Sequence, residues 1–135
     1  MDQSLGMPSI FTRIINGEIP SYTIAEDEHC YAFLDINPNA IGHTLCVPKK
    51  EVDNLYDLDE ESYSHLMEFA KRIAVALKQV VPCKRVGMAV VGLEVPHAHV
   101  HLIPINEMHE MSFQTKVKMH EDEFISLAEK IKSKL

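Results

Sequence analysis

The sequence has no apolar run long enough to cross a membrane, because its longest apolar stretches are much shorter than the roughly 20 residues that a spanning helix needs. Its beginning also lacks the pattern of a secretory signal peptide. Cysteine is scarce: Cys30, Cys46 and Cys83 are odd in number and show no Cys-x-x-Cys spacing, which argues against a disulfide framework or a cysteine zinc site. We therefore expect a cytoplasmic protein without a membrane partner.

Clusters of lysine and arginine are also missing, and the acidic residues are spread along the chain. The formal net charge is -7, whereas non-specific binding of DNA or RNA needs a positively charged surface. The composition therefore argues against nucleic acid as a partner. A small nucleotide is compatible with it, because backbone N–H groups and imidazoles can hold a phosphate locally.

A chain of 135 residues is long enough for one compact domain with a hydrophobic core and short for two. No internal repeat or low-complexity segment divides it. We expect a flexible leader over residues 1–8, a main domain over residues 9–106, and a C-terminal extension over residues 107–135 that ends in a helix.

Hydrophobic periodicity and turn residues predict a protein of the α+β class. Apolar residues at helical spacing indicate a short helix after Ser9, a long helix ended by Pro82, and an amphipathic C-terminal helix. The strands have too little helix between them for parallel crossovers, so we expect a mostly antiparallel sheet. The expected helices cover residues 9–17, 59–81 and 121–135, and the expected strands cover residues 22–28, 30–36, 42–47, 85–92 and 95–104.

The long helix has one apolar stripe with the i, i+3, i+4, i+7 spacing of a buried face. His65 lies off that stripe, so we expect it to face solvent. Residues 107–119 follow no clear pattern, and we expect a loop in which methionines fill gaps. The stripe consists of Tyr63, Leu66, Met67, Ala70, Ile73, Ala74, Leu77 and Val81.

Histidines alternate with small or apolar residues over residues 95–104. Such an alternation predicts a strand. Successive side chains on a strand point to opposite faces, so His97, His99 and His101 share one face, roughly 6.6 Å between neighbours at about 3.3 Å per residue. The residues between and after them then face the core; these are Ala98, Val100 and Leu102.

Two kinds of chemistry fit three imidazoles on one face. Zinc accepts three histidines plus a water molecule, so the row is compatible with a metal site. The middle imidazole could instead act as a nucleophile while its neighbours stabilise charge and handle protons. The histidines of the row alone leave these two interpretations open.

A further histidine, His43, favours the second interpretation. It ends a Pro-x-Ala-x-x-His run and precedes an apolar strand and a Pro-Lys pair. Together with the alternating histidines of residues 96–104, this pattern resembles the histidine triad (HIT) family of nucleotide hydrolases and transferases, and within it the phosphoramidase-like branch. The resemblance extends from residue 10 to about residue 105 and includes the run Glu18-Ile19-Pro20 and the run Phe33-Leu34-Asp35-Ile36.

The resemblance implies a HIT-like fold, in which a five-stranded, mostly antiparallel sheet carries a long helix and a C-terminal helix. It also implies a homodimer that joins two such sheets, with the nucleotide lying over the sheet. The carboxylate of Asp35 would bond the ribose hydroxyls. The base would contact apolar residues, for which a plain core role is the alternative: Phe11, Ile14, Ile19, Ile36 and Leu45.

The resemblance further implies that His99 attacks phosphorus and forms a nucleotidyl-histidine, which water then hydrolyses. Physical chemistry agrees, because an imidazole with a pKa near 6.5 is mostly neutral at pH 7 and has a free lone pair. Hydrogen bonds from His97, His101 and His43 would stabilise the phosphate oxygens, and these residues would carry protons to the leaving group. No metal or other cofactor is required.

We therefore expect a nucleotide-binding hydrolase or transferase that cleaves a nucleoside 5′-monophosphate, with a purine as the expected base, from an amine or another small leaving group. Hydrolysis of dinucleoside polyphosphates is the alternative among enzymes. A non-catalytic nucleotide-binding module and a zinc protein that uses the same histidines are the alternatives of other classes.

One segment departs from the family pattern. Residues 91–96 are several residues shorter than in many members, lack an Asn, and carry Glu94 where a Ser or Thr hydroxyl commonly donates to phosphate. An ionised carboxylate accepts hydrogen bonds and cannot donate one. We expect Glu94 at the mouth of the phosphate site, where it favours cationic amine leaving groups over polyphosphates; a solvated loop acid is the alternative.

Overall fold

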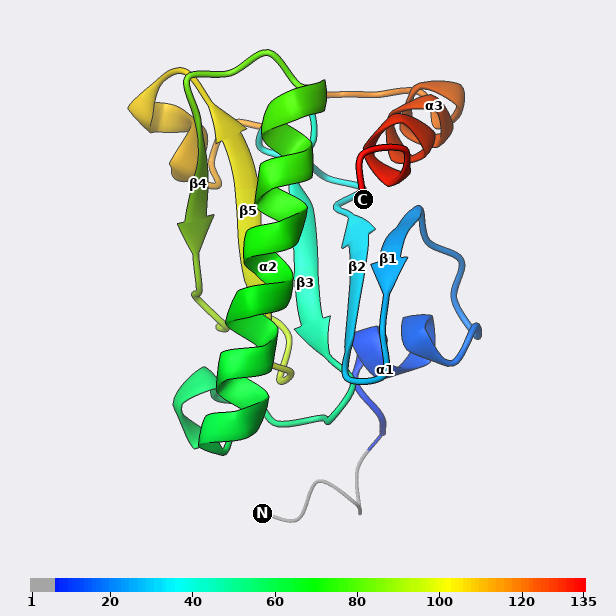
Figure 1. Ribbon diagram of the computed structural model, residues 1–135, viewed down its shortest axis with the longest axis vertical. Coiled ribbons are helices and arrows are strands. Elements are labelled where there is room, and N and C mark those ends of the chain that lie inside the picture. The colour runs from blue at the N-terminus through cyan, green and yellow to red at the C-terminus, as the bar shows by residue number, and fades with distance from the viewer. Residues whose placement is uncertain (1–6) are drawn as a thin grey trace.

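The computed structural model describes residues 7–135, and these form a five-stranded sheet with helices packed against its faces (Figure 1). All strand pairings are antiparallel, in the order β1-β2-β3-β5-β4, which confirms the predicted α+β class. The first six residues of the expected leader lie outside the described residues. The strands are β1 Thr23–Glu26, β2 Cys30–Leu34, β3 Thr44–Pro48, β4 Arg85–Ala89 and β5 Val100–Ile105, and the helices are α1 Ile10–Ile15, η2 Leu55–Asp57, α2 Glu60–Val80, η3 Met108–Met111 and α3 Glu121–Lys132.

Side chains just before the helices fix where these begin. The Ser9 hydroxyl accepts a hydrogen bond from the Thr12 N–H and caps α1. The Asp59 carboxylate accepts from the Ser62 N–H and caps α2. These side chains satisfy backbone donors that have no partner within the helix. Both starts agree with the boundaries expected from the sequence.

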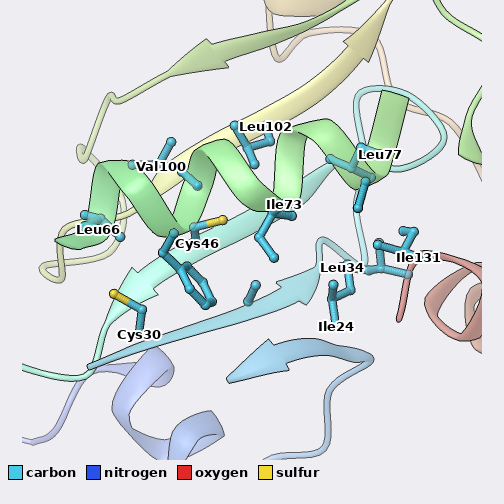
Figure 2. Close-up of a cluster of buried hydrophobic side chains, with 14 of the residues drawn as sticks. Ile24, Cys30, Leu34, Cys46, Leu66, Ile73, Leu77, Val100, Leu102 and Ile131 are labelled. Atoms are coloured by element: carbon cyan, nitrogen blue, oxygen red, sulfur yellow. The ribbon is translucent and has the colours of Figure 1, made fainter. Parts of the chain in front are cut away.

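Helix α2 covers one face of the sheet and forms the main hydrophobic core with it (Figure 1). Figure 2 shows Leu66, Ile73 and Leu77 of α2 directed toward the strands, with α3 closing one end of this layer through Ile131. The predicted stripe on α2 is correct for its fully buried members but omits Phe69 and Ala76, which are also buried, and includes Tyr63, which is 39% exposed. The buried face of α2 is therefore wider than the predicted stripe on its Phe69 and Ala76 side.

The other face of the sheet carries a second, smaller cluster. Helix α1 packs there through Phe11 and Ile14 against Phe33 and Leu45. Neighbouring residues in the pairing share a face, and the register aligns Leu45 with both Phe33 and His101. The histidines therefore lie on the α1 face, while Val100 and Leu102 face α2, as predicted.

The histidine row is only partly a strand. β5 begins at Val100, so His97 and His99 precede the regular pairing, and the prediction of a strand from residue 95 was wrong. The cause is that the Ala98 N–H donates to the carbonyl of Val52 in the loop before η2, outside the sheet. The other strands are also shorter than predicted, most of all β1 and β4.

His65 is a second correction. It is half-buried, and its Nε2 lies 2.9 Å from Asp27 Oδ2, with its ring 4.5 Å from that of His29. The prediction of a solvent-facing residue was wrong because periodicity along α2 does not reveal the loop between β1 and β2 that packs beside it.

Residues 107–119 form η3 and irregular structure, in which two of the three methionines fill gaps as predicted, whereas Met108 is 85% exposed. Met111 lies against the space left by the missing side chain of Gly87, where an added Cβ would meet its sulfur at 2.8 Å. Met119 packs against the main core.

None of the helices within residues 7–135 combines the length and apolar character required to cross a bilayer.

Gly42 should be the least replaceable glycine of the fold. Its φ is +93°, and an added Cβ would lie 3.0 Å from both Pro104 Cγ and Val81 Cγ2, whereas Gly17, at φ +80°, has nothing within 4 Å. We expect Gly17→Ala to cost about 1–2 kcal/mol of unfolding free energy from the left-handed backbone alone. Gly42→Ala should cost about 1–3 kcal/mol more, because the core must move. Urea denaturation of both variants measures this difference, and equal losses would contradict it.

Candidate active site

The four histidines predicted to be functional come together on the α1 face. The rings of His99 and His101 are 4.8 Å apart, and those of His43 and His101 are 5.2 Å apart. Phe11 joins His97 to His99, because its ring meets both edge-on at 5.6 and 4.9 Å. All four histidines are almost completely buried in the free chain. The candidate site is thus a buried row of imidazoles with aromatic contacts.

Both ring nitrogens of His97 are engaged with the protein. Its Nε2 lies 2.7 Å from the Pro48 carbonyl oxygen and must donate to it, so in the neutral ring Nδ1 accepts the hydroxyl hydrogen of Ser9 at 2.6 Å. Burial lowers the pKa of His97, which favours this neutral form. The ring of His97 therefore has no free nitrogen for a ligand.

Glu51 supports this arrangement from behind. It accepts hydrogen bonds from the Ser9 N–H and the Thr12 hydroxyl. Burial alone would raise the pKa of the Glu51 carboxyl, but these hydrogen bonds hold that pKa below its usual value. Sequence reasoning missed Glu51 because it lies 46 residues before His97 and belongs to no recognisable motif.

His99 has one nitrogen fixed and one free. Its Nδ1 lies 2.8 Å from the carbonyl oxygen of His97 and must donate to it. In the neutral ring, the remaining nitrogen, Nε2, then carries a lone pair without a proton. Burial lowers the pKa of His99, so the lone pair is available at neutral pH. This is the state that a nucleophile requires.

A second hydrogen-bond chain fixes the proton of His101. The backbone N–H of Asn39 donates to His43 Nδ1 at 2.9 Å, so the proton of neutral His43 is on Nε2. That Nε2 lies 3.0 Å from His101 Nδ1 and donates to it. The proton of neutral His101 is therefore on its Nε2. His99 thus offers a lone pair while its neighbour His101 offers an N–H.

Burial keeps these imidazoles neutral. Burial lowers the pKa of His43 to about 3, and repulsion by a protonated His101 and by Lys116 acts in the same direction. Burial likewise lowers the pKa of His101 to about 4, with added repulsion from a protonated His99 and from Lys116. Both values lie far below pH 7, so neither residue is charged there.

Asp35 lies at the edge of this group. Its N–H donates to the His43 carbonyl at 2.9 Å, its Oδ1 accepts from the Asn37 N–H, and its Oδ2 is 3.6 Å from His43 Nε2. Burial raises the pKa of this carboxyl, although Lys116 and His99 counteract it. Asp35 therefore caps the turn after β2 with one carboxylate oxygen, while its other oxygen faces His43.

Two residues that sequence reasoning missed complete the site. The ring of Phe113 lies 4.7 Å from that of His101 and 6.0 Å from that of His43. Lys116 Nζ lies 2.8 Å from Asn39 Oδ1 and 5.3 Å from the Phe113 ring. Phe113 has a positive φ of 65°, unusual for a large side chain. Only the return of the chain after η3 brings both residues here, and no local pattern reveals it.

The apolar residues predicted to contact a base differ in exposure. Phe11, Ile14 and Leu45 are nearly buried, and Ile19 is half-buried at the edge of the same cluster. Ile36 is 72% exposed. The first group can form the floor of a ligand site, whereas Ile36 stands free beside Asp35.

Glu94 is exposed, yet it lies close to the site. Its charge raises the pKa of both His99 and Asp35. It accepts no hydrogen bond from a side chain or backbone group of residues 7–135 that would hold it elsewhere. A negative charge therefore stands near the imidazole row.

Two groups of side chains within residues 7–135 have metal-ligand composition: Asp35 with His43 and His101, and Asp27 with Cys30 and His65. In the first, the two imidazoles bond each other, so a metal would have to break that contact. In the second, Asp27 already pairs with His65 and with Arg72 at 3.5 Å, and burial raises the pKa of the Cys30 thiol to about 12. Neither group is preorganised for a cation.

The family model for the HIT domain matches residues 16–108, a range that contains His43 and the whole histidine row. The chain belongs to the HIT family. Adenosine 5′-monophosphoramidase HNT1 of Saccharomyces cerevisiae is 40% identical over 102 residues, which are 75% of this HIT protein and 65% of the yeast protein. An uncharacterised HIT-like protein of Borreliella burgdorferi is 39% identical over 102 residues, 70% and 73% of the two chains.

Solved structures share the fold over nearly the whole chain. A Hit-like protein of Bartonella henselae superposes with a TM-score of 0.82 at 32% identity, covering 94% of this chain and 96% of that one. A zinc-bound histidine triad protein of Mycobacterium smegmatis has a TM-score of 0.78 at 26% identity, covering 93% and 91%. The predicted family and fold are thereby confirmed.

The neutral histidines should make stability fall on mild acidification. The histidines of the unfolded chain regain pKa values near 6.5, so below that pH the unfolded state binds more protons and the unfolding free energy must decrease. For His101 and His43 the loss continues toward about pH 4 and pH 3. Each contributes up to about 1.4 kcal/mol per pH unit. The raised pKa of Asp35 has the opposite effect, because the folded state binds more protons at this carboxyl, but it is one group against several histidines.

Urea unfolding at pH 6.5, 5.75 and 5 measures the effect above the range in which ordinary carboxyl groups titrate. In the matched variant, His43→Gln, unfolding takes up about one proton fewer per molecule. The unfolding free energy of this variant should therefore fall less steeply with decreasing pH, by up to about 1.4 kcal/mol per pH unit. A stability that stays constant over this range in the unmodified protein would contradict the neutral assignment.

Proposed function

We propose that this HIT protein cleaves a nucleoside 5′-monophosphate, with a purine base, from an amine through a nucleotidyl intermediate on His99. The hydrogen bond from His99 Nδ1 to the His97 carbonyl carries the proposal, because it leaves Nε2 unprotonated. The relative named adenosine 5′-monophosphoramidase, at 40% identity, supports the same reaction class.

In the first step, Nε2 of His99 attacks phosphorus and the bond from phosphorus to the leaving nitrogen breaks. The departing amine takes one proton from solvent. In the second step, water attacks phosphorus, the bond to His99 breaks, and the water returns one proton to solvent. The products are the amine and the nucleoside monophosphate, and His99 regains its original state.

The other histidines would act without changing their own charge. His101 Nε2–H can donate a hydrogen bond to a phosphate oxygen, since the hydrogen bond from His43 directs the proton to that nitrogen. A pKa of about 4 leaves His101 without a second proton to release at pH 7. His97 is a positioning residue in this proposal, because both its nitrogens bond the protein.

Charge compensation for the phosphate would come from Lys116, the cation whose charge lowers the pKa of Asp35 and His101. A positioned cation stabilises negative charge as it develops on phosphate oxygens. Phe113, whose ring packs edge-to-face against that of His101, would close the side of the site near Lys116.

The nucleoside would lie beside the Phe11 cluster. Phe11, Ile14, Ile19 and Leu45 supply an apolar floor, and the exposed side chain of Ile36 can cover one face of the base. The Oδ2 of Asp35 can accept a hydrogen bond from a ribose hydroxyl.

Replacing the nucleophile tests the reaction directly. We expect His99→Ala to lower kcat by several factors of ten while the affinity for the product nucleotide changes within a few-fold, because binding is spread over the pocket. Hydrolysis of an adenosine phosphoramidate, followed by chromatography, and calorimetric titration of AMP measure the two effects.

Activity should survive exhaustive chelation, and loss of turnover on chelation would favour the zinc alternative. Equal kcat for variant and unmodified protein would remove His99 from the mechanism. Absence of turnover in the unmodified protein, with AMP still bound, would favour a non-catalytic binding module.

We also propose a homodimer formed through β4. This strand is at the edge of the sheet, and the apolar side chain of Met88 on it is 43% exposed. An exposed edge strand with apolar side chains is a site for association.

Sedimentation at micromolar concentration should give twice the chain mass of 15.3 kDa, and Met88→Lys should shift the protein toward monomer. The control is Ile125→Lys, on α3, because Ile125 is 50% exposed but α3 packs over the opposite edge strand β1. A monomeric unmodified protein, or equal behaviour of both variants, would contradict this interface.

Unpaired, buried Cys30 and Cys46 fit a reducing compartment such as the cytoplasm.

A further inference from the structure

A cavity of about 330 Å³ opens beside His99, between η2 and the segment that joins β4 to β5. Its walls come from segments far apart in the sequence, one before α2 and one after β4. Ala98 and His99 form its inner end. The lining residues are Asp53, Asn54, Leu55, Tyr56, Val90, Val91, Gly92, Leu93, Ala98 and His99.

The rim of this cavity is apolar and unusually exposed. Leu93 is 89%, Tyr56 82% and Val91 53% exposed. Large apolar side chains that gather around a hollow mark a binding surface more often than an ordinary exterior. The rim therefore suits a ligand with an aliphatic or aromatic body.

The charge at this cavity is negative. Asp53 is in the lining, and none of the lining residues within the described part of the chain is Lys or Arg. Glu94 follows Leu93 directly, and its charge reaches His99. Lys116, in contrast, stands beyond His101 at Asn39. A second negative group, such as a further phosphate, would be repelled here, whereas an ammonium group would be attracted.

The position of the cavity identifies which part of a substrate it would hold. The phosphorus must come within reach of His99 Nε2, and the cavity shares only His99 with the residues proposed to hold the nucleoside and phosphate. The remaining substituent of the phosphorus is the leaving group. Its path therefore leads into this cavity.

We propose that this cavity is the leaving-group subsite and that it selects amines with an apolar or aromatic body and a second, protonated amino group. This inference rests on the proposed function and extends it to the substrate class. It disfavours dinucleoside polyphosphates, whose leaving group is anionic. Asp53 and Glu94 supply the attraction, and Tyr56 and Leu93 supply the apolar contact.

Four adenosine 5′-phosphoramidates test the proposal, with propylamine, phenethylamine, 1,4-diaminobutane or 4-aminobutyrate as the leaving amine. The measured quantity is kcat/KM, compared as a ratio between two amines and then between variants. The intrinsic reactivity of each amine is the same in every variant, so it cancels from that second comparison.

We expect the unmodified protein to prefer the diaminobutane over the aminobutyrate substrate. Asp53→Asn and Glu94→Ser should each reduce that preference about two- to fivefold, the range typical of partly exposed charge pairs. Asp57→Asn is the matched control, an exposed acid of η2 outside the lining, and should leave the preference unchanged. Tyr56→Ser and Leu93→Ser should reduce the preference for phenethylamine over propylamine severalfold.

Turnover of all four substrates with ratios that none of these variants changes would overturn the subsite and leave the proposed function intact. An equal effect of Asp53→Asn and Asp57→Asn would overturn the specific role of the cavity, because it would reflect net charge alone. If the unmodified protein turned over none of the four, the proposed function and the subsite would both be wrong.

Discussion

The site depends on the hydrogen bond from His99 Nδ1 to the carbonyl oxygen of His97. Imidazole has two nitrogens and, when neutral, one proton, so a fixed donor at Nδ1 determines that Nε2 is the base. The carbonyl can do this because the His97 ring is itself held between Ser9 and Pro48. The N-terminal cap of α1 and the end of β3 thereby control the protonation of a residue on a third segment.

Fixed hydrogen bonds also determine which nitrogen carries the proton in His43 and His101. A backbone N–H, which cannot change its role, donates to His43 and thereby sets the direction of the whole chain of protons. Burial then removes the charged forms. Two imidazoles of the same chemical type therefore present opposite groups to a phosphate, a lone pair from His99 and an N–H from His101.

The sequence predicted the shared face of the histidines because alternation survives even where the chain leaves regular strand geometry, as it does before Val100. His43 was predictable for a different reason, since it ends a distinctive turn and directly precedes β3. The antiparallel sheet also followed from the short connections between strands. These features are local, and local patterns are what a single sequence encodes most directly.

What the sequence could not predict depends on contacts between distant segments. Glu51 reaches the site through the side chain of Thr12, and Phe113 and Lys116 reach it after the chain has passed through η3. The tautomers of His97 and His101 are of the same kind, because each depends on a partner from another segment. The cavity beside His99 likewise exists only after η2 and the β4–β5 connection come together.

Intact-mass spectrometry of protein quenched in acid-free denaturant during turnover of an adenosine phosphoramidate tests the central claim most directly. The account predicts a species heavier by one adenylyl group, with the modification on the peptide that contains His99, and its absence from His99→Ala. Turnover at the full rate with no covalent species at any time point, or with the adenylyl group on another histidine, would contradict it.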